Sequence, residues 1–241
     1  MVDLKLGDCY EVIKTLQDNS VDLIITDPPY EFNPNNNGGG KMYETRQYHK
    51  EILSKHGGKN LDIGITNQLL EEFKRVLKQM NLVIFINQYQ FPQILNWCVE
   101  NSYRYTITVW NKVNPIPATN NKYLDDLEFI VCIREDGKKM WGDYDSKHRV
   151  YSSPINKRDK DLFGHPTIKP VELIEKYIVN HSLEGETILD TFMGSGTTGV
   201  ACRKLSRNFI GIELDERYYN VAKGRIEGQA VQAEKVKMQL F

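Results

Sequence analysis

Seven apolar runs along the chain have the length of β-strands. They fall at residues 4–6, 21–26, 82–86, 105–110, 127–133, 187–192 and 208–214. The runs at 21–26, 82–86, 187–192 and 208–214 are apolar at nearly every position, which is typical of strands buried on both faces. We therefore expect these segments to lie inside a sheet that is covered on both sides.

Between several of these runs, apolar residues recur at helical spacing. Leu70, Phe73, Leu77 and Met80 mark one helical face within 67–80, and Pro170 stands at the first position of a helix predicted over 169–182. Two more helical patterns cover 198–206 and 217–226. Strands alternating with helices predict the α/β class, with a mainly parallel sheet and helices on both faces. Since no internal repeat or second core is visible, we predict a single domain over 1–241.

Two polar stretches interrupt this alternation. Residues 31–60 are rich in Asn and Gly, and residues 137–164 combine aromatic with basic side chains. The net charge of the whole chain is only −1, but 41–59 holds five Lys/Arg against two Glu and 138–160 holds seven Lys/Arg against three Asp. Loops of this length in a compact domain are usually functional or disordered, and local charge alone fits solvated loops as well as a polyanion site.

Composition narrows the class of protein. The chain has 241 residues, of which 40% are hydrophobic, as in ordinary globular domains. It has no apolar run near the roughly 20 residues that cross a bilayer and no signal-peptide pattern, so we expect no membrane partner. The four cysteines have no paired spacing, which favours a reducing compartment and argues against a metal site. We expect a cytoplasmic protein.

A glycine-rich turn is the first candidate for chemistry. Residues 187–214 read as strand, turn, helix and strand, with Gly194, Ser195 and Gly196 where the chain must turn sharply and admit a ligand to its backbone. Glu213 ends the following strand, where it can accept hydrogen bonds from ribose hydroxyls. The pattern predicts a nucleoside-containing cofactor. Because Gly194, Gly196 and Gly199 also match the dinucleotide fingerprint, a nicotinamide-dependent oxidoreductase remains an alternative, as does a glycine loop without a ligand.

The second candidate is Asp27-Pro28-Pro29-Tyr30, directly after a buried strand. An exocyclic amino group of a nucleobase is a poor nucleophile because its lone pair is delocalised into the ring. The Asp27 carboxylate and the Pro28 carbonyl could accept its two hydrogens, and Asp27 would also compensate the developing positive charge. Two consecutive prolines fix the direction of that carbonyl, and Tyr30 offers a face for base stacking. A rigid turn whose aspartate caps a helix is the structural alternative.

Together these motifs resemble the amino-directed DNA methyltransferases that use S-adenosylmethionine, in the circular order called the β class. Asp27–Tyr30 precedes the cofactor turn, as in that class. The segments HPTIKP (165–170), GDCYEVIKTL (7–16), WNKVNP (110–115) and GIELDERYYNVAKGRI (211–226) are also similar to family motifs. One departure is Thr191, where the family often has proline. The resemblance covers about 4–226 and implies a Rossmann-like, seven-stranded mixed sheet between helices.

The resemblance also implies roles for individual residues. The catalytic group would be Asp27, Pro28, Pro29 and Tyr30. Asp8 and Cys9 would meet the adenine of S-adenosylmethionine, and Glu213 its ribose. The remaining cofactor contacts would be His165, Thr167, Lys169, Asp190, Phe192, Gly194, Ser195, Gly196 and Thr197, with Thr167 and Lys169 near the methionine carboxylate.

For the DNA partner, the resemblance implies a mobile loop at 31–60 that closes over the duplex after base flipping, and a short target-recognition segment at about 137–164. Candidate DNA contacts are Lys41, Arg46, Trp141, Arg149, Lys157 and Arg158. Aspartate in the first motif position favours adenine N6 over cytosine N4, which stays the alternative. A catalytically silent DNA-binding relative is disfavoured because the motifs are intact. A homodimer and a cognate restriction enzyme sharing the recognition site remain open, as does a cellular or phage origin.

Overall fold

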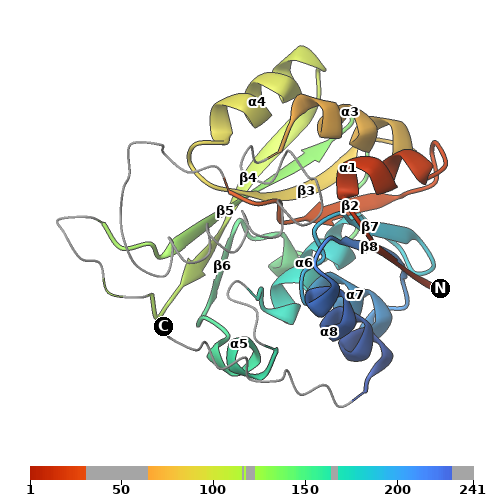
Figure 1. Ribbon diagram of the computed structural model, residues 1–241. Coiled ribbons are helices and arrows are strands. Elements are labelled where there is room, and N and C mark those ends of the chain that lie inside the picture. Colours follow the sequence, from red (N-terminus) through yellow and green to blue (C-terminus); the bar gives the residue numbers. More distant parts are fainter. Residues whose placement is uncertain (31–64, 116, 118–122, 164–167, 230–241) are drawn as a thin grey trace, which may run out of the picture.

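The described residues form one mixed sheet of eight strands with helices around it, seen in a computed structural model (Figure 1). The structure describes residues 1–30, 65–115, 117, 123–163 and 168–229. The strands are β1 (Val2–Leu6), β2 (Leu23–Thr26), β3 (Asn81–Ile86), β4 (Arg104–Lys112), β5 (Leu127–Arg134), β6 (Val150–Ser153), β7 (Thr187–Asp190) and β8 (Asn208–Glu213). The helices are α1 (Cys9–Val12), α3 (Asn67–Val76), α4 (Phe91–Glu100), α5 (Lys157–Phe163), α6 (Val171–His181), α7 (Thr197–Lys204) and α8 (Glu216–Glu227), with 3-10 turns η1 (Ile13–Thr15) and η2 (Asp145–Lys147).

The sheet order is β1-β8-β7-β2-β3-β5-β4-β6. Strand β5 is antiparallel to both of its neighbours, β3 and β4, and the other described pairs are parallel. The α/β class and the mixed sheet are therefore confirmed, but the expected number of seven strands is wrong. The additional strand is β6, a short edge strand with only half-buried and exposed positions, so it lacks the apolar run used to recognise the others.

Helices cover both faces of the sheet, as Figure 1 shows with α3 and α4 on one side and α6, α7 and α8 on the other. The hydrophobic core is accordingly split into two clusters. Alternate residues of β3 point to opposite clusters: Leu82 and Ile84 pack with α3 and α4, whereas Val83 and Phe85 pack with α6 and α7. This explains why β2 and β3 are apolar at nearly every position.

The topology places a crevice between β2 and β7. These two strands are parallel neighbours, but the chain leaves β2 toward β3 and leaves β7 toward β8, on the other side. In open α/β sheets, ligands bind at such a switch point, outside the carboxyl ends of the strands. We call the edge where the parallel strands end the carboxyl edge, and the opposite one the amino edge. Both predicted motifs, Asp27–Tyr30 and Gly194–Gly196, follow strands that end at the carboxyl edge.

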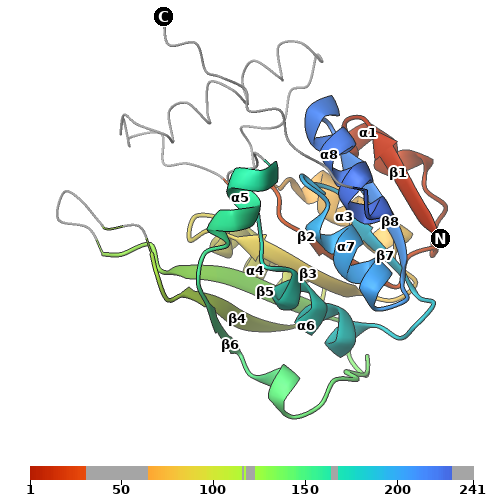
Figure 2. The same ribbon diagram turned by 90° about the horizontal axis from the view of Figure 1, so that it is seen from below.

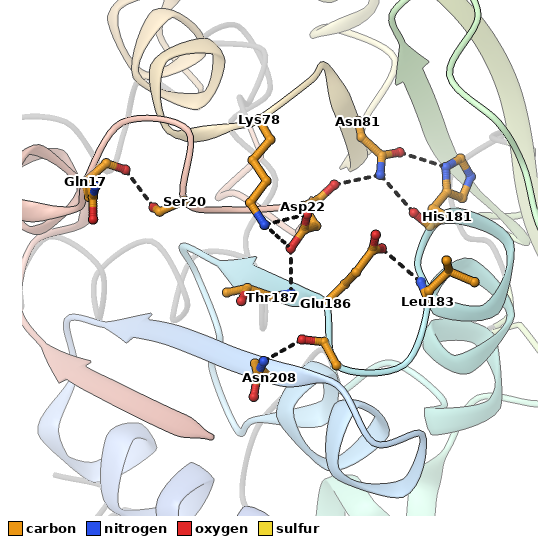
Figure 3. Close-up of polar contacts among 11 residues, drawn as sticks. Gln17, Ser20, Asp22, Lys78, Asn81, His181, Leu183, Glu186, Thr187 and Asn208 are labelled. Atoms are coloured by element: carbon orange, nitrogen blue, oxygen red, sulfur yellow. Dashed lines mark hydrogen bonds and ion pairs between the residues drawn. The ribbon is translucent and has the colours of Figure 1, made fainter.

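A buried polar network ties the strands together at the amino edge (Figure 3). Asp22 accepts two hydrogen bonds from Lys78 Nζ, at 2.8 and 2.9 Å, and one from the Thr187 amide at 2.9 Å. Asn81 Nδ2 donates to the carbonyls of Asp22 (2.8 Å) and His181 (2.9 Å), and Asn81 Oδ1 lies 3.1 Å from His181 Nδ1. Burial lowers the pKa of His181 to about 3, so its imidazole is neutral. The network joins β2, β3, β7 and the end of α6.

The segment predicted for target recognition is divided between the two edges. Because β5 runs toward the amino edge, the residues after it begin there, and the Trp141 amide donates to the carbonyl of Asn180 near the end of α6 (2.9 Å). Ser146 also hydrogen-bonds Asn180, at 2.9 Å. Strand β6 then runs back parallel to β4, so that η2 and α5 lie at opposite ends of β6 (Figure 2). Within this segment, only the residues that follow β6, which include α5, return to the carboxyl edge.

Within the ranges described above, no helix is long and apolar enough to cross a bilayer.

Candidate active site

The two predicted motifs meet at the carboxyl edge. Thr26, the last residue of β2, and Thr191, directly after β7, lie with their Oγ1 atoms 3.0 Å apart. A cavity between the two turns is lined by both motifs. From the predicted site it receives Asp27, Lys169, Asp190, Phe192, Gly194, Ser195 and Thr197. Residues separated by more than 160 positions in the sequence are thus brought to one site, as the switch-point topology requires.

The glycine turn has a defined geometry. Gly194 and Gly196 both have positive φ angles, of 51° and 80°, in the left-handed region where side chains are strained. Asp190 holds the turn from within, because Oδ1 accepts from the Phe192 amide (3.1 Å) and Oδ2 from the Thr198 hydroxyl (2.6 Å). Burial raises the pKa of Asp190 to about 6. Asp190 therefore braces the turn from the cavity wall.

Glu213 links this turn to the start of the chain. Its Oε2 accepts from the Gly194 amide and its Oε1 from the Asp215 amide, both at 2.8 Å. The Glu213 carbonyl accepts from the Gly7 amide at 2.9 Å, directly before Asp8 and Cys9. Burial raises the pKa of Glu213 to about 7. The residues predicted to meet the adenosine portion of a cofactor thus come from two elements, the start of α1 and the end of β8, that are adjacent in space.

Asp8 also has a structural role. It is the N-cap of α1, and its carboxylate accepts from the Tyr10 amide at 3.0 Å. Cys9 is buried, and burial together with the charges of Asp8 and Glu213 raises the pKa of its thiol. Cys9 is therefore neutral, and it packs in the hydrophobic cluster that contains α3 and α4.

Asp27 lines the cavity beside a buried cation. Lys169, which precedes α6, places Nζ 2.5 Å from Asp27 Oδ2. The other carboxylate oxygen, Oδ1, is buried and has no hydrogen-bond partner in the described structure. Burial raises the pKa of Asp27, Lys169 opposes this, and the charge of Glu128 adds to it. An unpartnered buried carboxylate oxygen is costly, and its place beside the cavity makes it an acceptor aimed at a ligand.

Glu128 completes this cluster, and our sequence analysis did not identify it. Its Oε1 accepts from Tyr30 Oη (2.9 Å) and pairs with Lys169 Nζ (2.6 Å), while Oε2 pairs with Lys112 Nζ (3.2 Å). Burial alone would raise the pKa of Glu128, but the two lysines outweigh it and hold that pKa below its ordinary value. The acidic position in the apolar run 127–133 was the available signal.

A second residue missed in the sequence is Arg225 of α8. Its side chain is 5% exposed and donates from Nη1 to the Ser195 carbonyl (2.7 Å) and hydroxyl (2.9 Å). On its other side, Arg225 lies 4.1 Å from the Phe163 ring and 3.9 Å from Asp159 Oδ2, both in α5. Arg225 therefore connects the glycine turn to the helix that carries Lys157 and Arg158.

The predicted DNA contacts are not gathered in one place. Lys157 and Arg158 lie in the first turn of α5, and Arg149 is exposed directly before β6. Trp141, under the Lys139 ammonium at 4.2 Å, lies toward the amino edge, away from Asp27. Four predicted contacts and the predicted loop lie outside the described residues: His165, Thr167, Lys41, Arg46 and 31–60.

No group of three or more His, Cys, Asp or Glu among the described residues is arranged to hold a metal ion. The four cysteines are buried and unpaired.

The fold and the site together define a doubly wound α/β protein with its ligand cavity at the switch point. A family model described as a DNA methylase of the N6/N4 type matches residues 21–224. The chain therefore belongs to the N6/N4 DNA methylase family. Membership makes it a DNA methyltransferase. The glycine turn alone was also compatible with a nicotinamide-dependent oxidoreductase, and the family decides between the two in favour of methyl transfer.

Individual relatives agree with this assignment. The chain is 30% identical over 243 residues to the type II methyltransferase M.HinfI of Haemophilus influenzae, covering 91% of this chain and 67% of that protein. It is 30% identical over 237 residues to the type II methyltransferase M2.MboI of Moraxella bovis, covering 91% and 85%.

Two solved structures are similar in fold to this chain. The crystal structure of a complex of M1.HpyAVI with SAM is 28% identical, with a TM-score of 0.66 over 94% of this chain and 99% of that one. The PvuII DNA methyltransferase, described as cytosine-N4-specific, gives a TM-score of 0.69 over 93% and 86%, at 17% identity. At that identity the likeness shows the fold alone.

Proposed function

We propose that this protein transfers the methyl group of S-adenosylmethionine to the exocyclic N6 amino group of adenine in double-stranded DNA, within a short recognition sequence. The observation that supports it most is the Asp27 carboxylate, with one oxygen held by Lys169 and the other buried, unpartnered in the described structure and beside the cavity of the glycine turn. An acceptor in that place suits an amine that loses a proton as it gains a methyl group.

Residues of the cavity and of the adjoining glycine turn fit the cofactor chemically. Lys169 is a buried cation for a carboxylate, the positive-φ turn at Gly194 and Gly196 lets a ligand approach the backbone, and Glu213 is an acceptor for hydroxyl groups. When bound, S-adenosylmethionine supplies a methyl group on a sulfonium, which leaves as a neutral thioether. We assign the adenosine portion to Asp8, Cys9 and Glu213, and the methionine portion to the turn and Lys169.

The chain's own groups would then act on the target base. The base must leave the duplex to reach Asp27, and its ring would stack on Tyr30. Asp27 Oδ1 accepts one amino hydrogen, which favours a tetrahedral nitrogen with a free lone pair, and the Pro28 carbonyl accepts the other. As the new N–C bond forms, the positive charge on nitrogen is stabilised by Asp27, and the released proton passes to it or to solvent.

A product analysis tests this proposal. The purified protein is incubated with S-adenosylmethionine and unmethylated DNA, and the DNA is digested to nucleosides and analysed by mass spectrometry. We expect N6-methyldeoxyadenosine. Detection of N4-methyldeoxycytidine instead would keep the mechanism and overturn the choice of base. Methylation-sensitive sequencing of the same DNA then gives the recognition sequence. The type II names of the relatives support a place beside a restriction enzyme that shares this sequence.

A substitution at Asp27 tests the site itself. Asp27→Asn keeps the size of the side chain and removes its charge, so we expect kcat to fall by about 10²–10³-fold, as when a transition-state acceptor or donor is lost. Asp18→Asn is the matched control, because Asp18 pairs with Arg75 away from the cavity and is largely exposed. A wild-type rate in Asp27→Asn would exclude Asp27 from the reaction.

A further inference from the structure

We propose that Glu128 is a positioning residue for methyl transfer, which holds Tyr30 as the stacking platform and shares Lys169 with Asp27. This inference rests on the proposed roles of Asp27 and Tyr30. Glu128 lies outside the two motifs in sequence, and its position in the fold is set by β5, the strand that runs against its neighbours.

The register of the sheet brings Glu128 to the site. Glu128 is opposite Trp110 on β4 and one position beyond the β3–β5 pairing of Ile86 with Phe129. It therefore extends past β3 at the carboxyl edge, near the end of β2. Ile130, two positions further along β5, points to the same face of the sheet and packs in the cluster with α6. Lys169, which precedes α6, approaches from that face.

The contacts of Glu128 use the whole carboxylate. Oε1 binds both Tyr30 Oη and Lys169 Nζ, and Oε2 binds Lys112 Nζ. The Glu128 side chain is 10% exposed and that of Lys169 is 9% exposed, so these pairs are only weakly screened. A hydroxyl held at 2.9 Å restrains the far end of the Tyr30 ring and so limits how far the ring can swing away from Glu128.

The cluster also divides charge between two carboxylates. Lys169 Nζ lies 2.5 Å from Asp27 and 2.6 Å from Glu128, so neither acid has the cation to itself. Glu128 has a second cation, Lys112, whereas Asp27 lies near two further acids, Glu128 and Asp190. Asp27 is therefore the less compensated of the two, which favours its interaction with an amine that becomes positive.

Two variants separate these effects. Glu128→Gln keeps an acceptor for Tyr30 but removes the charge, so Lys169 pairs with Asp27 alone and the pKa of Asp27 falls. We expect kcat to drop about tenfold or more, as for loss of one hydrogen bond to a charged group. We also expect the acid limb of kcat/KM to move to lower pH. Glu128→Asp keeps the charge but is one methylene shorter, so the acid limb stays in place while the contact with Tyr30 is lost.

A double-variant comparison tests the contact with the tyrosine. Tyr30→Phe removes only the hydroxyl, so Tyr30→Phe combined with Glu128→Asp should lose no more kcat/KM than the larger single loss. Independent, multiplied losses would overturn the positioning of Tyr30 by Glu128. This comparison stands even if Glu128→Gln does not fold.

The control is Glu71→Gln, because Glu71 lies on α3, outside the site, and accepts there from Trp97 Nε1 (3.0 Å). It should match wild type in kcat and in the acid limb. If Asp27→Asn abolishes methylation while Glu128→Gln behaves like Glu71→Gln, the inference about Glu128 is wrong and the proposed function stands. If Asp27→Asn retains full activity, the proposed site fails before Glu128 is considered.

Discussion

Replacing Gly196 with alanine tests two contributions to stability at the glycine turn, backbone strain and the space available for a side chain. Gly196 has φ of +80°, and a Cβ placed there would lie 2.8 Å from Ala222 Cβ and 2.9 Å from Ala222 Cα in α8. Gly185 has the same φ of +80°, but a Cβ at that position would have no described atom within 4 Å. The two glycines therefore share the backbone strain and differ in the space available, which makes Gly185→Ala a matched control.

The magnitudes follow from these contacts. Left-handed strain costs an L-residue roughly 1–2 kcal/mol, partly offset by about 0.4–1 kcal/mol from the less flexible unfolded chain. Gly185→Ala should therefore lower the free energy of unfolding by about 1 kcal/mol. Gly196→Ala adds overpacking against the α8 backbone, typically about 1–3 kcal/mol, for a total of about 3 kcal/mol.

Urea unfolding of both variants measures these differences, with equal m-values required for the comparison. Isothermal titration with S-adenosylmethionine provides a second result: we expect weaker binding in Gly196→Ala and wild-type binding in Gly185→Ala, because Gly185 is at the amino edge. Equal losses of stability in the two variants would refute the claim that the turn is packed tightly against α8.

Two further predictions concern buried polar groups. Since the pKa of folded Glu213 is raised to about 7 from its ordinary value of 4.5, the folded state binds more protons than the unfolded one between those values, and the free energy of unfolding should fall as pH rises through this window. When urea unfolding is measured at about pH 5.5 and about pH 8, the free energy of unfolding should fall less between the two pH values in Glu213→Gln than in wild type. Asn81→Leu should lose about 3 kcal/mol or more, because it leaves the carbonyls of Asp22 and His181 without a buried donor.

Each of these two predictions can be contradicted by a specific result. An identical pH dependence in wild type and Glu213→Gln would mean that Glu213 is ionised without cost in the folded protein. For Asn81→Leu, the KM for S-adenosylmethionine should stay at the wild-type value, because the network is at the opposite edge of the sheet. A change in that KM would show that the network also controls the site.

Local patterns predicted most of the scaffold. The strands at 82–86, 187–192 and 208–214 were predicted because each run is almost continuously apolar, and the spacing of Leu70 and Phe73 marked α3. Strand β6 was missed because an edge strand needs no apolar run. Helices α4 and α5 were not anticipated either, although Pro92 stands in the first turn of α4.

The site was predictable where its residues form short motifs. Asp27–Tyr30 and Gly194–Gly196 could be identified because turns need particular residues in sequence. Lys112 and Arg225 could not, and Glu128 gave only the weak signal of an acid in an apolar run, because their roles depend on strand register and helix packing that join distant segments. The same limit applies to 137–164: a continuous basic stretch gives no sign that the chain visits the amino edge before it returns.

The reversed direction of β5 has a consequence for how the chain can change in length. Residues 113–126 join β4 to β5, and insertions or deletions there leave the pairing of Glu128 with Trp110 intact. One residue inserted within β5 after Glu128 would instead turn its carboxylate to the other face of the sheet. Among relatives that share this cluster, length variation should therefore concentrate between the two strands, while the strand from Glu128 to Arg134 keeps its length.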